Sequence, residues 1–154
     1  MFAILRNILA IALLSIAAGA GAIEYGTADE AKALVAKAAE FYKANGKDKL
    51  LEQINDPHGL FVSHDLYVVA YGVADGLRLA HPYQKDLIGK SVATAVDPDG
   101  KHYGEEEMTV IKTKGTGWVD YKFPDPVTKK PVEKSFYLLK VDKDIFLGCG
   151  VYKR

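Results

Sequence analysis

The C-terminal third of the chain constrains the fold most, because it reads as three consecutive strands with large apolar side chains on both faces. The expected strands cover residues 116–123, 132–141 and 145–152. Successive side chains of a strand point to opposite faces. Tyr137 and Leu139 therefore share one face of the middle strand, and Phe136 and Leu138 share the other. A sheet with two apolar faces has to be covered on both sides, which predicts at least three layers.

The first of these covering layers is expected to be a long helix near the start of the domain. Thr27 and Glu30 have the spacing of a capping box, in which each side chain bonds the backbone amide of the other residue. An apolar stripe at three- and four-residue steps follows, formed by Ala31, Leu34, Val35, Ala38, Phe41 and Tyr42. Asn45-Gly46 is a typical helix terminus. A second, shorter helix is expected over residues 48–54.

The middle of the chain predicts a hairpin and another helix. Residues 66–71 and 77–81 are rich in strand-forming side chains and flank Asp75-Gly76, a strong tight-turn signal. The segment 97–100 (Asp-Pro-Asp-Gly) is a second turn. A helix is expected over residues 102–114, with Tyr103, Met108 and Ile111 facing inward.

This order of elements predicts an α+β domain built on one antiparallel sheet of five to six strands. The long N-terminal helix would cover one face. Loops and the shorter C-terminal helix would cover the other face, and a layer made largely of loops is where a ligand cavity can form.

The first 22 residues read as an export signal. Arg6 precedes an apolar run of residues 8–18, and Ala20-Gly21-Ala22 has the small-residue pattern of a cleavage site. The run is shorter than the roughly 20 residues of a membrane-spanning helix. We expect a signal peptide at 1–22 and a single domain at 23–154 that is periplasmic and not inserted in the membrane. An uncleaved anchor is the alternative.

Composition argues against several classes of function. The whole chain has 20 basic and 20 acidic residues, and loss of Arg6 with the leader leaves the charge near neutral, so no nucleic-acid partner is expected. Cys149 is the single cysteine, which rules out an intramolecular disulfide and suggests a buried apolar residue.

Enzyme and metal motifs are missing from the sequence. Ser63-His64-Asp65 contains the residue types of a catalytic triad, but neighbours along a strand do not converge in space. Residues 105–107 are three glutamates that fan around a helix and read as a solvated face. The histidines lack metal-ligand spacing, and Asp97-x-Asp99 lacks the later ligands of a calcium loop. We therefore expect no enzyme activity, no cofactor and no metal.

The order of elements and two segments resemble a known family. The segments are 117–122 (Gly-Trp-Val-Asp-Tyr-Lys), with the Pro-Val-Thr-Lys-Lys loop that follows, and 148–152 (Gly-Cys-Gly-Val-Tyr). They resemble the single Cache domains, extracytoplasmic sensor modules with a PAS-like fold, over most of residues 27–153. The resemblance implies a small organic ligand, often a short carboxylate or an amine. Family members usually precede a transmembrane helix and a signalling domain. Since this chain ends at Arg154, we expect any signal to pass to a separate sensor kinase or chemoreceptor.

Seven residues are candidates for contacting the ligand: Tyr67, Tyr71, His81, Trp118, Tyr121, Tyr137 and Lys140. The resemblance places the first three on a pocket-lining hairpin. Trp118 and Tyr121 lie on opposite faces of one strand, so only one of them is expected to reach the pocket. Gly148 and Gly150 leave space that Lys140 or Tyr137 could face.

Each candidate also has a structural interpretation. A tyrosine can be a core aromatic, His81 a hydrogen-bonded turn residue, and Lys140 an exposed strand end that pairs with no ligand. At the level of function, the sensor hypothesis competes with an interaction module whose pocket is vestigial, and more remotely with an enzyme.

Overall fold

The computed structural model describes residues 25–125 and 127–153. Its helices are α1 (Ala28–Asn45), α2 (Lys47–Asn55), α3 (Tyr103–Thr113) and a 3-10 turn, η1 (Lys85–Leu87). Its strands are β1 (Val62–Ser63), β2 (Leu66–Gly72), β3 (Arg78–Ala80), β4 (Thr116–Pro124), β5 (Pro131–Lys140) and β6 (Ile145–Tyr152). The expected signal peptide at 1–22 lies outside the described residues. None of the described helices is long and apolar enough to cross a membrane.

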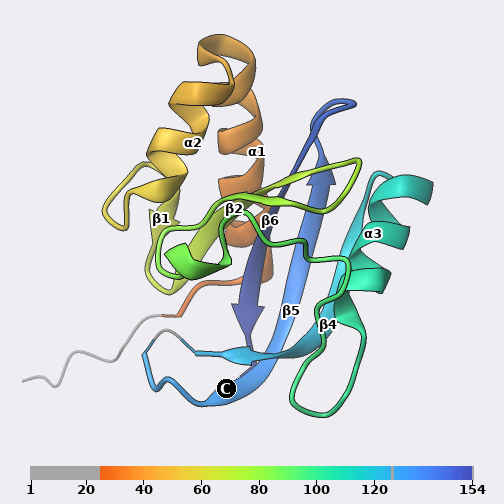
Figure 1. The fold of residues 1–154 in the computed structure, drawn as a ribbon. Coiled ribbons are helices and arrows are strands. Elements are labelled where there is room, and N and C mark those ends of the chain that lie inside the picture. The colour runs from red at the N-terminus through yellow and green to blue at the C-terminus, as the bar shows by residue number, and fades with distance from the viewer. Residues whose placement is uncertain (1–24, 126, 154) are drawn as a thin grey trace, which may run out of the picture.

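One six-stranded antiparallel sheet organises the domain (Figure 1). The strand order is β1-β2-β6-β5-β4, and β3 pairs with β2 outside this path. The central strand β6 therefore joins the hairpin to the two long C-terminal strands. In the β5–β6 register, Phe136 is opposite Gly150 and Leu138 is opposite Gly148. The expected α+β class and the five- to six-stranded sheet are confirmed.

The helix α1 begins at the expected capping box. The Glu30 amide donates to Thr27 Oγ1 at 3.3 Å, and the Thr27 amide donates to Glu30 Oε2 at 2.8 Å. A cap of this kind stabilises a helix by about 1 kcal/mol. The buried side of α1 packs on β6 and β2, together with α2. Figure 1 shows the two helices gathered on one side of the sheet.

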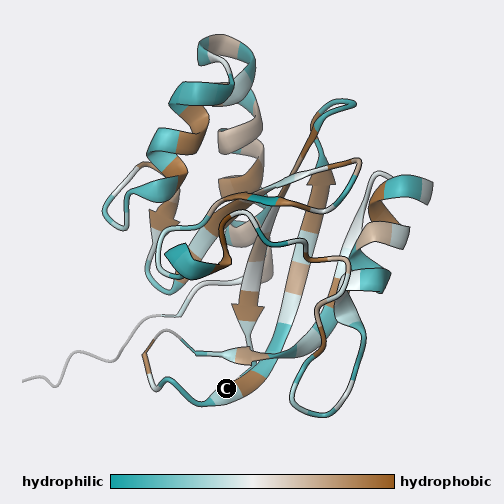
Figure 2. Cartoon of the chain, in the orientation of Figure 1, coloured by the Kyte–Doolittle hydropathy of each residue, from teal (hydrophilic) through white to brown (hydrophobic). Residues whose placement is uncertain are grey.

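The opposite face of the sheet is covered by α3 and by the long connection between β3 and α3. Met108 and Ile111 of α3 are buried there, as expected, and so is Tyr103. The helix approaches the connection so closely that a Cβ on Gly104 would lie 1.7 Å from the carbonyl oxygen of Val92. Brown apolar stretches run along the strands between the two layers in Figure 2, while the outward sides of the helices are mostly teal.

The two segments that resembled chemical motifs are turns. Ser63 ends β1, and residues 64–65 form the turn to β2. His64 has φ 55°, and the Asp65 carboxylate accepts a hydrogen bond from the Gly26 amide at 2.7 Å. Asp97 accepts hydrogen bonds from the amides of Asp99, Lys101 and Lys122. Its carboxylate is therefore used to close the turn.

The sequence interpretation of residues 105–107 as a solvated helix face is wrong for one of the three glutamates. Glu107 is 0% exposed, whereas the side chains of Glu105 and Glu106 are 71% and 52% exposed. The reason is helical spacing, because Glu107 lies four residues from both Tyr103 and Ile111 and so shares their inward face.

Candidate ligand-binding site

Two buried cations lie between the sheet and the α3 layer. Arg78 of β3 is 6% exposed and Lys134 of β5 is 2% exposed. Neither takes part in any of the ion pairs found between described residues. Buried charges are normally paired, because an uncompensated charge in a low-dielectric interior is costly. The candidate site is therefore the cluster formed by Arg78, Lys134 and the side chains that surround them.

The Lys134 ammonium is held by hydroxyl groups and aromatic rings. Its Nζ donates to Tyr67 Oη at 2.9 Å and to Tyr152 Oη at 3.3 Å. It also lies 4.5 to 5.3 Å from the ring centroids of Tyr67, Tyr152, Phe123 and Phe136. Cation–π contacts offset part of the cost of burial. Burial nevertheless lowers the pKa of Lys134 to about 8.

The long stem of Lys134 fits only because β6 has a glycine beside it. A Cβ on Gly150 would lie 1.8 Å from Lys134 Cε, and one on Gly148 would lie 2.3 Å from Phe136 Cε1. The space that the sequence predicts above the two glycines is therefore filled by Lys134 and Phe136. Neither Lys140 nor Tyr137 faces it.

Arg78 lies at the α3 end of the same cluster. Its Nη2 donates to Tyr103 Oη at 3.4 Å, and its guanidinium carbon is 5.9 Å from the centroid of the Tyr71 ring. The Tyr103 ring is stacked on Tyr121, with centroids 3.9 Å apart. Burial lowers the pKa of Arg78, but Tyr71, Tyr103 and Glu107 outweigh it and leave that pKa above its usual value. Arg78 thus stays a permanent cation.

His81 is fixed as a neutral ring. Its Nδ1 accepts hydrogen bonds from the amides of Tyr83 at 3.1 Å and Gln84 at 3.0 Å, so its one proton has to be on Nε2. Burial lowers the pKa of His81 to about 3, and the nearby cations Lys134, Arg78 and Lys85 act in the same direction. The ring therefore offers an N–H donor and no charge at neutral pH.

Glu107 is the third charged residue of the cluster. Its carboxylate oxygens accept no hydrogen bond from any described residue. Burial raises the pKa of Glu107 to about 8, although Arg78, Lys134 and Tyr121 act against this shift. Near neutral pH the carboxyl group is therefore mostly protonated, and the two cations keep their positive charge.

Two small cavities meet at Tyr67 and His81. The inner one, of about 10 Å³, lies among Arg78, Lys134 and their aromatic neighbours. The outer one, of about 100 Å³, is lined by Tyr83, Gln84, Pro124, Asp125 and Lys129 as well. Tyr83 is 44% exposed and its ring is 5.2 Å from that of Tyr67, so the outer cavity connects the cluster to the surface.

The structure brings four of the seven candidates together. Tyr67, Tyr71, His81 and Tyr121 all line the inner cavity. They come from three parts of the chain (β2, the end of the hairpin, and β4), which the sheet places side by side.

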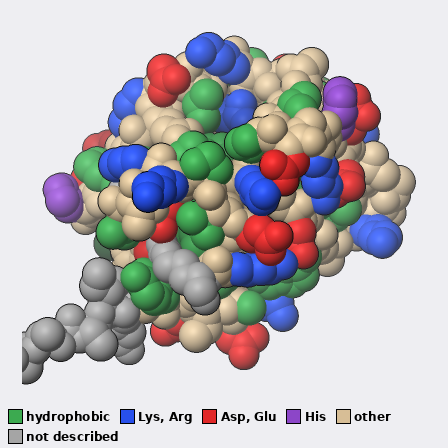
Figure 3. All heavy atoms as spheres, turned by 90° about the horizontal axis from the view of Figure 1, so that it is seen from below, with side chains coloured by type: hydrophobic (Ala, Val, Ile, Leu, Met, Phe, Trp, Pro, Cys, Tyr) green, Lys and Arg blue, Asp and Glu red, His purple; other side chains and the backbone are tan. Residues whose placement is uncertain are grey.

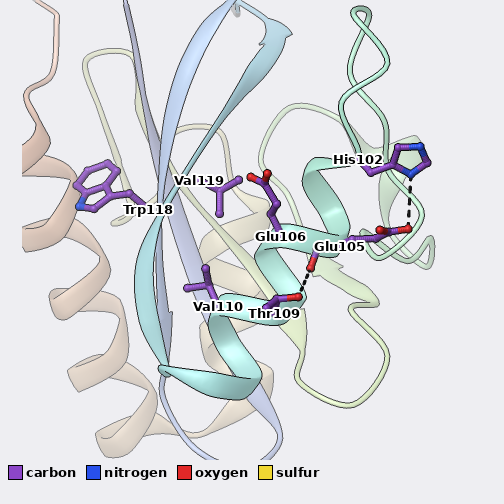
Figure 4. A pocket seen from close by; sticks show the side chains of 7 residues that line it. All are labelled: His102, Glu105, Glu106, Thr109, Val110, Trp118 and Val119. Carbon is purple, nitrogen blue, oxygen red and sulfur yellow. Dashed lines mark hydrogen bonds and ion pairs between the residues drawn. The ribbon is translucent and has the colours of Figure 1, made fainter.

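The other three candidates lie elsewhere. Trp118 and Tyr137 pack together on the α1 side of the sheet, with ring centroids 5.2 Å apart, and Lys32 of α1 lies over the tryptophan ring. Figure 4 shows Trp118 on the opposite side of β4 from α3. Lys140 is exposed at the end of β5. Trp118 and Tyr121 do lie on opposite faces, as expected.

Sequence reasoning missed Arg78, Lys134, Tyr103, Glu107 and Tyr152. A signal was available for Lys134, which alternates in step with Phe136 and Leu138 and therefore shares their face. Arg78 carries no such signal, because β3 has only three residues.

A wider groove lies outside this cluster, between α3 and the edge strand β4 (Figure 4). Its volume is about 460 Å³, but it is shallow and its polar groups are engaged with one another. Glu105 pairs with His102, Glu106 pairs with Lys101, and Thr109 donates to the Glu105 carbonyl. The groove lacks the buried, unpaired charges that distinguish the cluster.

Charges of both signs are mixed on the face of the described residues that Figure 3 shows, where acidic and basic side chains lie beside one another. Exposed ion pairs include Lys122–Asp99 at 2.6 Å and Lys153–Asp120 at 3.0 Å. Among residues 25–125 and 127–153, no three metal-binding side chains are grouped.

Solved structures with the same fold define the class of protein. A Cache chemosensory domain studied for carboxylic acid recognition matches with a TM-score of 0.63 and 26% identity, over 82% of this chain and 88% of that one. The periplasmic sensor domain of a chemotaxis protein matches with a TM-score of 0.63 and 22% identity, over 82% and 90% of the two chains. A methyl-accepting chemotaxis protein from Vibrio parahaemolyticus matches with a TM-score of 0.66 and 22% identity, over 80% and 86%.

The protein is thus a PAS-like sensory domain of the extracytoplasmic type. The family model of single Cache domain 2 matches residues 5–154, and the chain belongs to that family. The resemblance noted in the sequence is confirmed. The family is sensory rather than enzymatic.

Proposed function

We propose that this Cache domain binds a small organic carboxylate between Arg78 and Lys134 and reports it to a membrane-bound signalling partner. The observation that carries the proposal is the pair of buried cations without a carboxylate partner among the described residues. A ligand carboxylate would supply the missing negative charge. Hydrogen bonds between cations and carboxylates are about twice as strong as neutral ones.

The neutral groups around the cations fit the same ligand. Tyr67, Tyr71 and Tyr121 present ring faces and hydroxyl groups, and His81 presents the Nε2–H donor. Such groups can orient a carboxylate without adding charge. The two cavities are small, which favours a ligand of a few heavy atoms. The 26% identical Cache domain studied for carboxylic acid recognition supports this ligand class.

The route of the signal is part of the proposal. Two of the structural neighbours belong to chemotaxis proteins, which supports a chemoreceptor or a sensor kinase as the partner. A leader at 1–22 would deliver the domain to the periplasm, where both the ligand and the outer part of such a partner are accessible.

Thermal unfolding of the purified protein tests the proposal. Acetate, propionate, lactate and pyruvate would be compared with amines, amino acids and purines at matched ionic strength. A ligand at a hundred times its Kd stabilises the native state by about 2.7 kcal/mol, which is a shift of several degrees for a domain of this size. We expect this shift with carboxylates and its loss in Lys134→Met.

Two other outcomes would contradict the proposal. Stabilisation by amines alone would move the ligand class from anions to cations. No shift with any compound would favour an interaction module with a vestigial pocket, and co-purification with a membrane sensor would then be the next measurement.

A further inference from the structure

Glu107 has no part in the proposed contacts with the ligand, yet it is a buried carboxylate whose charge interacts with both Arg78 and Lys134. It is 0% exposed, and neither oxygen has a hydrogen-bond partner among the described residues. An ionised carboxylate in such a place is far more costly than a protonated one, because the interior solvates charge poorly.

The groups that face Glu107 come from every element packed around it. They are Tyr71 of β2, Arg78 of β3, Tyr103 of α3 itself, Tyr121 of β4 and Lys134 of β5. The tyrosines are neutral, so the charge of the cluster depends on Arg78, Lys134 and Glu107. When Glu107 ionises, its negative charge offsets one of the two cations that an anionic ligand requires.

We propose that the site is competent to bind an anion only while Glu107 is protonated, so that ionisation of Glu107 releases the ligand. This inference rests on the proposed function, and it adds a regulation to that site. A bound anion and an ionised Glu107 repel each other in a low-dielectric pocket. By linkage, the anion therefore holds the proton on Glu107, and the proton strengthens binding of the anion.

The raised pKa of Glu107 agrees with its complete burial. With a pKa of about 8, Glu107 is largely protonated at pH 7 and largely ionised at pH 9. If only the protonated form binds, the affinity at pH 9 is about tenfold weaker than at pH 7. The domain would then report its ligand in neutral and mildly acidic surroundings and lose sensitivity in alkaline ones.

The test has to distinguish the titration of Glu107 from that of Lys134, because the pKa of Lys134 is also about 8. Affinity alone cannot do so, because loss of the Lys134 proton weakens anion binding over the same pH range. We would instead label the glutamate carboxyl carbons with ¹³C, assign the Glu107 resonance as the one missing from Glu107→Gln, and follow it by NMR from pH 5 to 10. Acetate would be the probe.

We expect the Glu107 resonance to titrate near pH 8 without acetate and about one pH unit or more higher with saturating acetate. Affinity for acetate should fall by more than tenfold from pH 7 to pH 9, because Glu107 and Lys134 both lose a proton in this range, and by less in Glu107→Gln. Glu105→Gln is the matched control, since it removes an exposed glutamate of the same helix. It should behave like the unaltered protein.

Three results would overturn the inference, and two of them would leave the proposed function intact. If Glu107 is already ionised at pH 6, or if bound acetate leaves its titration unchanged, the linkage is wrong while the ligand class stands. If neither acetate nor any other carboxylate perturbs the resonances of the cluster, the proposed function fails and the linkage fails with it.

Discussion

The buried stem of Lys134 lies directly against the backbone of Gly150, so closely that a Cβ at residue 150 would come within 1.8 Å of Lys134 Cε. The two residues are on neighbouring strands, with Gly150 opposite Phe136 in the register. The absent side chain on β6 thus creates the channel along which the lysine reaches Tyr67 and Tyr152. The register of β5 and β6 therefore determines where the Lys134 ammonium lies.

Gly150→Ala should displace the lysine. We expect a loss of about 1–3 kcal/mol in the free energy of unfolding, because overpacking a filled core has that cost. Affinity for carboxylates should fall at the same time. Chemical denaturation and ligand titration measure the two effects. Gly117→Ala is the matched control, because its Cβ would lie 2.9 Å from Val110 Cγ1, outside the cluster. Equal losses of affinity in the two variants would contradict a specific role for Gly150.

Lys134→Met should separate binding from stability. Methionine has a similar length and no charge to desolvate, so we expect the free energy of unfolding to stay unchanged or to rise by about 1 kcal/mol. Tyr67 and Tyr152 can still bond each other, since their hydroxyl oxygens are 3.1 Å apart. Stabilisation by carboxylates should disappear.

Lys140→Met is the control for the change from lysine to methionine, because Lys140 is exposed at the end of the same strand. It should leave both unfolding and ligand affinity unaltered. Loss of binding in Lys140→Met, with binding retained in Lys134→Met, would instead support Lys140, the lysine proposed from the sequence, as the ligand contact.

Arg78→Lys tests whether the shape of the guanidinium matters as well as its charge. A guanidinium offers two parallel donors to a carboxylate, whereas an ammonium does not. We expect affinity for carboxylates to fall about tenfold or more, with a smaller change in unfolding. Isothermal titration of both proteins against one carboxylate gives the comparison. An unaltered affinity would show that Arg78 acts only through its charge.

His81 should make the domain sensitive to acid. Its pKa is about 3 in the folded protein and near 6.5 when unfolded, so the unfolded state binds the extra proton between these values. Stability is therefore fully present above about pH 6.5 and is lost as pH falls towards 3, on the order of 1.4 kcal/mol per pH unit. Denaturation at pH 7, 5 and 4 measures the slope.

His81→Asn is the informative variant for this prediction. The amide oxygen of asparagine can replace Nδ1 as acceptor for the amides of Tyr83 and Gln84, and it does not titrate. The loss of stability between pH 6.5 and 4 should be smaller in this variant. An identical slope would assign the acid sensitivity to other groups.

Local patterns predicted the elements of the fold well. The Thr27 cap and the apolar stripe define α1, and the predicted helix at 102–114 differs from α3 by one residue at each end. These signals arise from neighbours in sequence, so they are readable without knowing the rest of the chain. The alternation that put Trp118 and Tyr121 on opposite faces is of the same kind.

The site was harder to predict because it depends on contacts distant in sequence. Alternation separates Trp118 from Tyr121 but does not say which of them faces the cluster, since that depends on which face of the sheet α1 covers. Lys134 and Glu107 look like ordinary surface charges by residue type. Only their spacing relative to Phe136 and to Tyr103 indicates burial, and that clue is weaker than the usual preference of charged residues for solvent.

The strand β6 separates the core on the α1 side of the sheet from the core on the α3 side. Leu147 and Cys149 point towards α1, while Gly148 and Gly150 adjoin Phe136 and Lys134 on the reverse. On that reverse side the glycines contribute only backbone, with no side chain to absorb a movement. If binding of the proposed ligand displaces Lys134, the backbone of β6 would therefore move with it, and α1, which packs on β6, would be displaced as well.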